Sequence, residues 1–214
     1  MLQRQTLLEI YRRLLVAYGN QNWWPADTPF EMMLGAILTQ NTAWQNVEKA
    51  IANLKQAEAL NLTFLLNAEP ERLAALVRPS GYFNIKAQRL QNFARWFQEQ
   101  GRYRQLARLD DMELRQRLLS VNGIGPETAD DILLYAFKRP VFVIDTYTRR
   151  ILLEFDLIQG NEGYEALRQA FEAALDPDVA LFQEYHALIV RHAKQSCSAD
   201  PDCRHCAVIA PLGE

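Results

Sequence analysis

The residues best placed to bind a ligand form a glycine-rich turn in the second half of the chain. Gly123 and Gly125 flank one apolar residue, Ile124, and Pro126 follows at the expected first position of a new helix. Glycines allow a tight reversal, and successive backbone N–H groups at the start of a helix attract an anion. This pattern predicts a hairpin that binds a phosphate, with Ile124 packed between its two helices. A helix–turn–helix corner without a ligand would share the pattern.

A single aspartate follows the second of these helices. Asp145 ends the apolar run 141–144 and precedes another helical segment at 146–156. An aspartate in this position commonly caps the helix, which contributes about 1 kcal/mol. The same position favours the charged form of the carboxylate, because helix N–H groups and the helix dipole stabilise it. We expect Asp145 to be ionised at neutral pH and open to solvent, as a simple cap or as an electrostatic catalyst.

All three cysteines of the chain, Cys197, Cys203 and Cys206, lie close to its C-terminus. An odd cluster of cysteines in a chain without secretory features indicates metal ligation before disulfide formation. His205 or His192 could complete a site with three cysteines and one histidine, as zinc accepts. His205, however, lies inside the short Cys203–Cys206 loop, where it would struggle to reach the same ion.

The elements that must position these residues are helices, because apolar residues recur at helical spacing along the whole chain. Gly19 ends the first helical segment. Thr28, Pro29 and Glu31 supply an N-cap, a first-position proline and a capping-box acid for the second. The strand-like run 141–144 is too isolated to build a sheet, so the sequence predicts an all-α fold. Further helices are expected at about 42–55, 70–77, 84–100, 111–120, 126–138, 146–156, 162–175 and 179–194.

Composition describes an ordinary globular chain. Of 214 residues, 49% are hydrophobic and 23% are charged, which excludes collagenous and wholly disordered classes. No apolar stretch approaches the roughly 20 residues that cross a bilayer, and no signal core is present, so we expect a cytoplasmic protein. The net charge of −3 argues against a non-specific polyanion binder. Basic residues outnumber acidic ones between 84 and 117, either as a solvated face or as a phosphate-facing surface.

The hairpin at 121–125, the residues at 128–129 and the segment 143–146 together resemble the helix–hairpin–helix superfamily of base-excision DNA glycosylases, the endonuclease III group. The segments 23–25 and 37–42, with 78–84, are most similar to its bacterial 3-methyladenine glycosylase branch. The resemblance implies two helical domains with a DNA-binding cleft. These are a six-helix barrel at 28–140 and a terminal domain made of 1–27 and 141–214.

The same resemblance implies the chemistry. Asp145 would lie beside the deoxyribose, where an ionised carboxylate stabilises an oxocarbenium-like transition state and can orient or deprotonate water. Relatives that also cut the strand carry a lysine two residues after the second hairpin glycine, whereas this chain has Glu127. A carboxylate cannot form an imine. We therefore expect a monofunctional glycosylase. The similarity to the 3-methyladenine branch implies that it excises alkylated bases. The reaction described above needs no cofactor.

The target base must leave the stack to be cut, so the resemblance also implies a wedge and a base pocket. Gln40 would lie in the loop that fills the vacated stack, beside Asn41, and could hydrogen-bond the orphaned base. Trp24, Pro25 and Trp44 would line the pocket, where indole rings attract a cationic alkylated purine by about 0.5–2 kcal/mol. The neighbouring Trp23 fits the pocket or the core equally well.

Many endonuclease III relatives hold a [4Fe–4S] cluster on four C-terminal cysteines spaced C-x6-C-x2-C-x5-C. Here the spacing is Cys197-x5-Cys203-x2-Cys206, and no fourth cysteine follows. Thiolates could still bind iron or zinc. A metal-free remnant is the first expectation, and an incomplete cluster is the alternative. The two histidines of the last long helix, His186 and His192, are expected to be surface or packing residues.

Two other functions fit the same residues. One is a mismatch or oxidised-pyrimidine glycosylase on the same scaffold, because the pocket that decides the substrate is poorly visible in a sequence. The other is a non-catalytic helix–hairpin–helix module that binds the duplex backbone. Asp145 would be unhelpful to a pure phosphate binder, since it repels phosphate. In each case the expected partner is double-stranded DNA, and the protein is expected to be monomeric.

Overall fold

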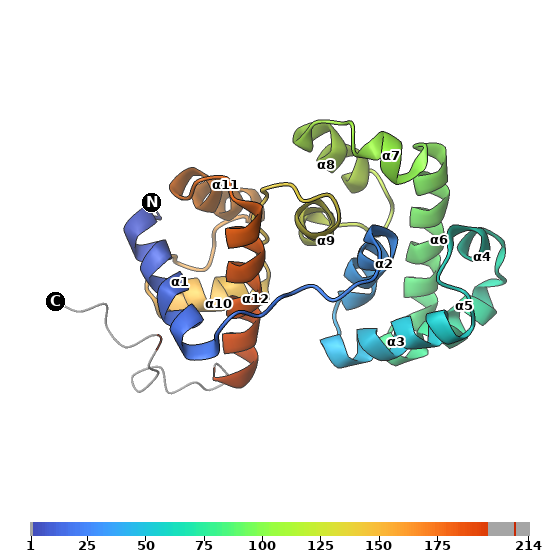
Figure 1. The fold of residues 1–214 in the computed structure, drawn as a ribbon, viewed down its shortest axis with the longest axis horizontal. Helices are drawn as coiled ribbons and strands as arrows, with labels where there is room; N and C mark the ends of the chain where they lie inside the picture. Colours follow the sequence, from blue (N-terminus) through green and yellow to red (C-terminus); the bar gives the residue numbers. More distant parts are fainter. Residues whose placement is uncertain (1, 197–207, 209–214) are drawn as a thin grey trace. The chain divides into compact units, whose positions relative to one another are not determined.

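The computed structural model describes residues 2–196 and residue 208, and within this part of the chain all regular elements are helices (Figure 1). The all-α prediction is confirmed. None of the helices described has the length and apolar character needed to span a bilayer. The elements are α1 (Arg4–Tyr18), α2 (Pro29–Thr39), α3 (Trp44–Gln56), α4 (Leu62–Asn67), α5 (Pro70–Val77), η1 (Arg78–Ser80), α6 (Phe83–Glu99), α7 (Arg102–Leu106), α8 (Asp111–Leu119), α9 (Pro126–Asp131), η2 (Ile132–Ala136), α10 (Thr146–Glu154), α11 (Tyr164–Ala174) and α12 (Val179–Gln195).

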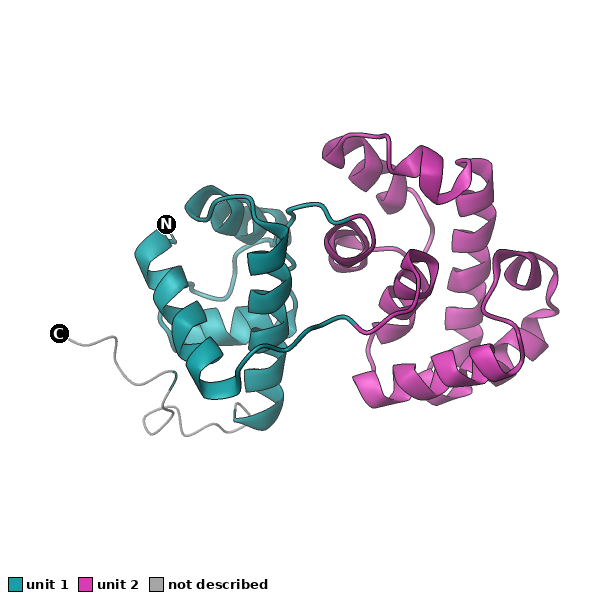
Figure 2. Cartoon of the chain, viewed as in Figure 1, with its two compact units in different colours: residues 1–24, 138–214 teal, residues 25–137 magenta. Residues whose placement is uncertain are grey.

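The chain divides into two compact units (Figure 2). The central unit comprises residues 25–137, and the terminal unit comprises residues 1–24 together with 138–214. The predicted barrel, 28–140, differs from the central unit by a few residues at each end. The hairpin belongs to the central unit and Asp145 to the terminal unit.

The core of the central unit is built around α2. This helix begins as the sequence predicts, because the Thr28 hydroxyl accepts a hydrogen bond of 3.1 Å from the backbone N–H of Glu31, and Pro29 occupies the first turn. Every residue from 31 to 38 is buried. The helix is covered by α3, α6, α9 and η2, which explains why it is apolar on all sides.

A buried lysine connects α2 to the start of α6. The Lys86 ammonium donates to the carbonyl of Leu38 at 2.8 Å and to that of Ser80 at 2.6 Å. Both carbonyls lie at helix C-terminal ends, which attract a cation. Burial, with a smaller contribution from the charge of Arg89, lowers the pKa of Lys86 to about 8. Lys86 thus fixes the end of α2, where Gln40 follows, against the end of η1.

The terminal unit packs α12 against α1 and α10. The non-helical run 141–144 enters its core, and the ring of Phe142 lies 4.1 Å from that of Phe171 and 5.3 Å from that of Phe182, measured between centroids. The run forms no strand, as predicted, and its burial carries the backbone directly to Asp145. A buried connection therefore fixes where α10 begins.

Some elements differ from the prediction. The expected helix at 126–138 is α-helical only to Asp131 and continues as the π-helical segment η2, whose five residues are all buried. Tertiary packing decides this geometry, which sequence periodicity does not reveal. Helices α4 and α7 were not predicted, because segments of five or six residues are too short to show a helical period.

Candidate functional site

The hairpin joins α8 to α9 in the central unit. The N–H of Ile124 donates to the carbonyl of Val121 at 3.0 Å, and the Ile124 side chain is buried, as the hairpin prediction requires. The two helices are held together by Arg115, which makes a bidentate ion pair with the fully buried Asp130, at 2.6 and 3.1 Å. Such paired, planar contacts are among the strongest hydrogen bonds of side chains. The ion pair therefore joins the two helices that the turn connects.

The two hairpin glycines have different roles. Gly123 adopts φ +99°, a conformation that side chains rarely tolerate, and a Cβ added there would collide with Cγ of Arg89 from α6. Gly125 adopts φ −93° and ψ 178°, which any residue can reach, and it serves as the N-cap residue of α9. The backbone conformation therefore requires glycine only at position 123, because only Gly123 is in the left-handed region.

Gln40, the C-cap residue of α2, braces the hairpin. Its Nε2 donates to the carbonyl of Gly123 and to the hydroxyl of Thr128, each at 2.9 Å, and its Oε1 accepts from the guanidinium of Arg89. No motif in the sequence indicates this role, because Gln40 and Gly123 are 83 residues apart. The predicted wedge role of Gln40 stays a prediction. The neighbouring Asn41 is exposed, at φ +52°.

Asp145 is the N-cap residue of α10, in the terminal unit. Its Oδ1 accepts from the N–H of Thr148 at 2.7 Å and from the Thr148 hydroxyl at 2.8 Å. Its Oδ2 lies 3.6 Å from Nε2 of His186, on α12. Only 12% of the side chain is exposed, so Asp145 is much less open to solvent than predicted. One oxygen is committed to the cap, which leaves Oδ2 as the candidate reactive atom.

The charge state of Asp145 follows from these contacts. Burial alone would raise the pKa of its carboxyl group, because a low dielectric disfavours the charged form. The nearby imidazole of His186, together with the two hydrogen bonds from Thr148, outweighs burial and holds the pKa of Asp145 below its ordinary value. Asp145 is therefore ionised at neutral pH, as its position before a helix predicts.

The two histidines of α12 are both buried, and their surroundings differ. His186 is buried, in agreement with the expectation of a packing residue, and its Nε2 lies next to the carboxylate of Asp145. Nothing in the sequence indicates this contact, since the two residues are far apart along the chain. His192 packs inside the terminal unit, where its Nδ1 hydrogen-bonds the hydroxyl of Tyr18 at 2.8 Å and burial lowers its pKa. The proposed metal ligands Cys197, Cys203, His205 and Cys206 lie outside the described residues.

The aromatic residues predicted to hold a base are half-buried. The rings of Trp23 and Trp24, in the terminal unit, lie 5.4 Å apart between centroids. Trp44, the first residue of α3, is also half-buried, and Pro25 is exposed. Half-buried indoles keep part of their surface available for stacking. These residues are divided between the two units, and the pocket that they would form stays a prediction.

Because Gly123 and Gly125 adopt different backbone conformations, alanine substitutions at the two positions should affect stability differently. We expect Gly123→Ala to lower the free energy of unfolding by about 1–3 kcal/mol, because alanine would be strained at φ +99° and would displace Arg89. Gly125→Ala, where nothing lies within 4 Å of the added Cβ, should change it by less than about 0.5 kcal/mol. Urea denaturation of both variants measures the difference. Equal losses would contradict the assignment of the left-handed turn to Gly123.

Comparison with known families gives a match over most of the chain. A model of the HhH-GPD superfamily of base excision DNA repair proteins matches residues 34–177. A candidate DNA repair glycosylase of Methanocaldococcus jannaschii is 44% identical over 207 residues, which are 95% of this chain and 94% of that protein.

Solved structures show the same relationship. The crystal structure of 3-methyladenine DNA glycosylase from H. pylori, bound to 1,N6-ethenoadenine, is 31% identical, with a TM-score of 0.76 over 91% of this chain and 98% of that one. A non-covalent endonuclease III–DNA complex has a TM-score of 0.80 at 16% identity and covers 98% of this chain and 94% of its own. The similarity to endonuclease III, at 16% identity, concerns the fold alone.

Proposed function

The chain belongs to the HhH-GPD superfamily of base excision DNA repair proteins, and from this membership we propose that it is a monofunctional DNA glycosylase that excises alkylated bases from duplex DNA. The observation that carries the choice of substrate is the likeness to the 3-methyladenine DNA glycosylase of H. pylori, which extends over nearly the full length of both chains. The protein acts as a monomer in this proposal.

Asp145 supplies the chemistry. As the base departs, positive charge develops on the deoxyribose, and a nearby carboxylate stabilises that charge. The hydrogen bonds from Thr148 fix the orientation of the side chain, and His186 helps to keep it ionised. A carboxylate with few water contacts interacts more strongly with a cationic sugar than a fully solvated one. Oδ2 also can orient or deprotonate the water that completes hydrolysis.

The proposed substrate is consistent with the rest of the site. An alkylated purine that carries positive charge is already a good leaving group, so it requires little acid catalysis. Indole rings attract such a base, and Trp23, Trp24 and Trp44 are half-buried aromatic residues of the kind that could hold it. The hairpin at 121–125, with its rigid turn and following helix start, is the part proposed to bind a DNA phosphate.

The residue at position 127 favours a reaction without strand cleavage. Glu127 is exposed in the first turn of α9, two residues after Gly125, where the lyase members of the superfamily carry their lysine. A carboxylate in a first turn is favoured by the helix dipole and has no nitrogen to form a Schiff base. The reaction would therefore end with an abasic site.

The substrate proposal predicts which free base is released. Incubation with duplexes that contain an alkylated purine, uracil, a mismatch or an oxidised pyrimidine should release base chiefly from the alkylated duplex, and strand breaks should appear only after hot alkali. Chromatography of the released base and denaturing gels measure both. Release chiefly from oxidised or mismatched duplexes would assign the alternative substrate, and no release from any duplex would favour a DNA-binding module.

The role of Asp145 predicts that Asp145→Asn lowers the rate of base excision by about 10²–10⁴-fold. Asparagine caps a helix as well as aspartate does, so the fold and much of the DNA affinity should remain. Asp178→Asn is the matched control, because Asp178 caps α12 in the same unit but is exposed. Single-turnover rates measure the effect. A native rate in Asp145→Asn would overturn the catalytic assignment.

The monofunctional assignment predicts that no covalent adduct forms. Borohydride added during turnover reduces a protein–DNA Schiff base to a stable adduct. No adduct should be trapped when this protein acts on a duplex from which it releases the base. An endonuclease III sample serves as the positive control. A trapped adduct would contradict the argument from Glu127.

A further inference from the structure

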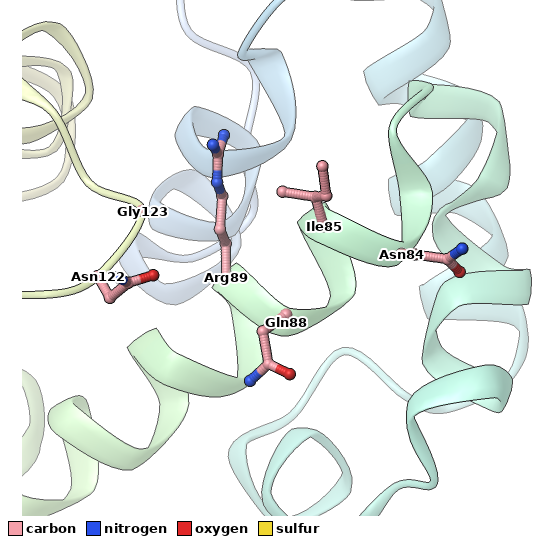
Figure 3. Close-up of a pocket in the computed structure, with 6 residues that line it drawn as sticks. All are labelled: Asn84, Ile85, Gln88, Arg89, Asn122 and Gly123. Carbon is pink, nitrogen blue, oxygen red and sulfur yellow. The ribbon is translucent and has the colours of Figure 1, made fainter.

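A groove of about 530 Å³ lies between α6 and the hairpin, entirely within the central unit. Figure 3 shows the six residues that line it, Asn84, Ile85, Gln88 and Arg89 from α6 and Asn122 and Gly123 from the hairpin. The groove thus shares a residue, Gly123, with the turn that is proposed to bind a phosphate. None of the six is acidic, and Arg89 carries a positive charge.

The polar floor of the groove is held in place by hydrogen bonds that Asn92 makes with Gln88, with Arg95 and with the backbone of Asn122. Gln88 donates to Oδ1 of Asn92 at 3.0 Å, and Asn92 donates to the carbonyl of Asn122 at 3.2 Å. Arg95 donates to the same Oδ1 of Asn92 at 2.7 Å. Figure 3 shows the Asn122 side chain turned toward α6. These amides are oriented before any ligand arrives, which reduces the entropy lost on binding.

The wall of the groove adds one apolar contact. Ile85 is 52% exposed, although it sits on a helix whose other large apolar residues are mostly buried. A groove with a single apolar residue among amides and an arginine does not suit a hydrophobic ligand or an amphipathic helix of a partner. It suits a nucleotide, which presents a flat ring, hydrogen-bonding edges and a negative charge.

We propose that this groove binds a nucleotide of the DNA strand whose phosphate the hairpin holds, as a contact site separate from the base pocket. Gly123 joins the two, because a strand that is bound by the turn must pass the neighbouring groove. Asn84, Gln88 and Asn122 offer amide groups to the sugar and the base edge, and Ile85 packs against the ring or the sugar. This inference rests on the proposed function in taking DNA as the ligand and in taking the hairpin to hold a phosphate of the same strand.

The test uses two isosteric substitutions on the same helix. Gln88→Glu places a negative charge in the groove, and Gln98→Glu places the same charge at the other end of α6, where the side chain is also exposed. Ten residues of helix separate them by about 15 Å, which exceeds the screening length of about 10 Å at 0.1 M salt. The two variants therefore share net charge and differ in distance from the groove.

We expect Gln88→Glu to weaken binding of a duplex with a stable abasic analogue by about three- to ten-fold at 0.1 M salt, and Gln98→Glu to change it by less than two-fold. Fluorescence anisotropy measures both. Asn84→Asp is a second groove variant whose new charge lies in the first turn of α6, where it favours the helix, so weaker binding there cannot be ascribed to unfolding.

Equal effects of Gln88→Glu and Gln98→Glu, or none from either groove variant, would overturn the inference. Base release by the wild-type protein is measured in parallel and separates the two proposals. If the wild-type protein releases alkylated base and the groove variants bind normally, only the groove fails. If no base is released but the groove variants bind DNA more weakly, the groove stands and the substrate assignment fails.

Discussion

The contacts that stabilise the ionised, almost enclosed carboxylate of Asp145 set the arrangement of α10 and α12 in the terminal unit. A charge in such a place persists only if its neighbours compensate for lost water. Here the start of α10 supplies two hydrogen bonds through Thr148, and α12 supplies His186. The buried run that ends at Asp145 fixes its backbone, with Phe142 packed against α11 and α12. The core of this unit therefore positions one oxygen atom, Oδ2.

In the central unit, contacts from α2 and α6 hold the hairpin turn in place. Gly123 keeps the turn open because it has no side chain, and the stem of Arg89 packs against it. Gln40 then joins Arg89 to the hairpin, while the buried Lys86 fixes the end of α2 from which Gln40 extends. Polar groups at the end of α2 and on α6 thus contact the hairpin turn, and the Arg115–Asp130 pair joins the two helices that the turn connects.

Local signals predicted much of this fold. The cap formed by Thr28 and Pro29 marks the start of α2, and α5 runs from Pro70 to Val77 as expected, because a proline starts it and its apolar face is periodic. Helix α4 has a capping signal, Asn61, but its six residues are too few for a period. The segment η2 is buried on all sides, so packing rather than pattern sets its geometry.

The site was predictable where its residues are neighbours in sequence. The cap by Asp145 and the burial of Ile124 follow from a few adjacent residues. The bracing of Gly123 by Gln40 spans 83 positions, and the contact of Asp145 with His186 joins two helices that no short motif relates. Such contacts depend on how elements pack, and a single sequence carries no record of that. The same reason explains why Gly123 and Gly125, which look equivalent in the sequence, are not.

The hydrogen bonds between Gln40 and the hairpin have an energetic consequence for the end of α2. Nε2 of Gln40 donates to Gly123 and to Thr128, and Oε1 accepts from Arg89, so moving this amide away from the hairpin would break three hydrogen bonds, each worth about 0.5–1.5 kcal/mol. Gln40 therefore couples the C-terminal end of α2 to the hairpin turn, so neither can shift relative to the other without breaking these bonds.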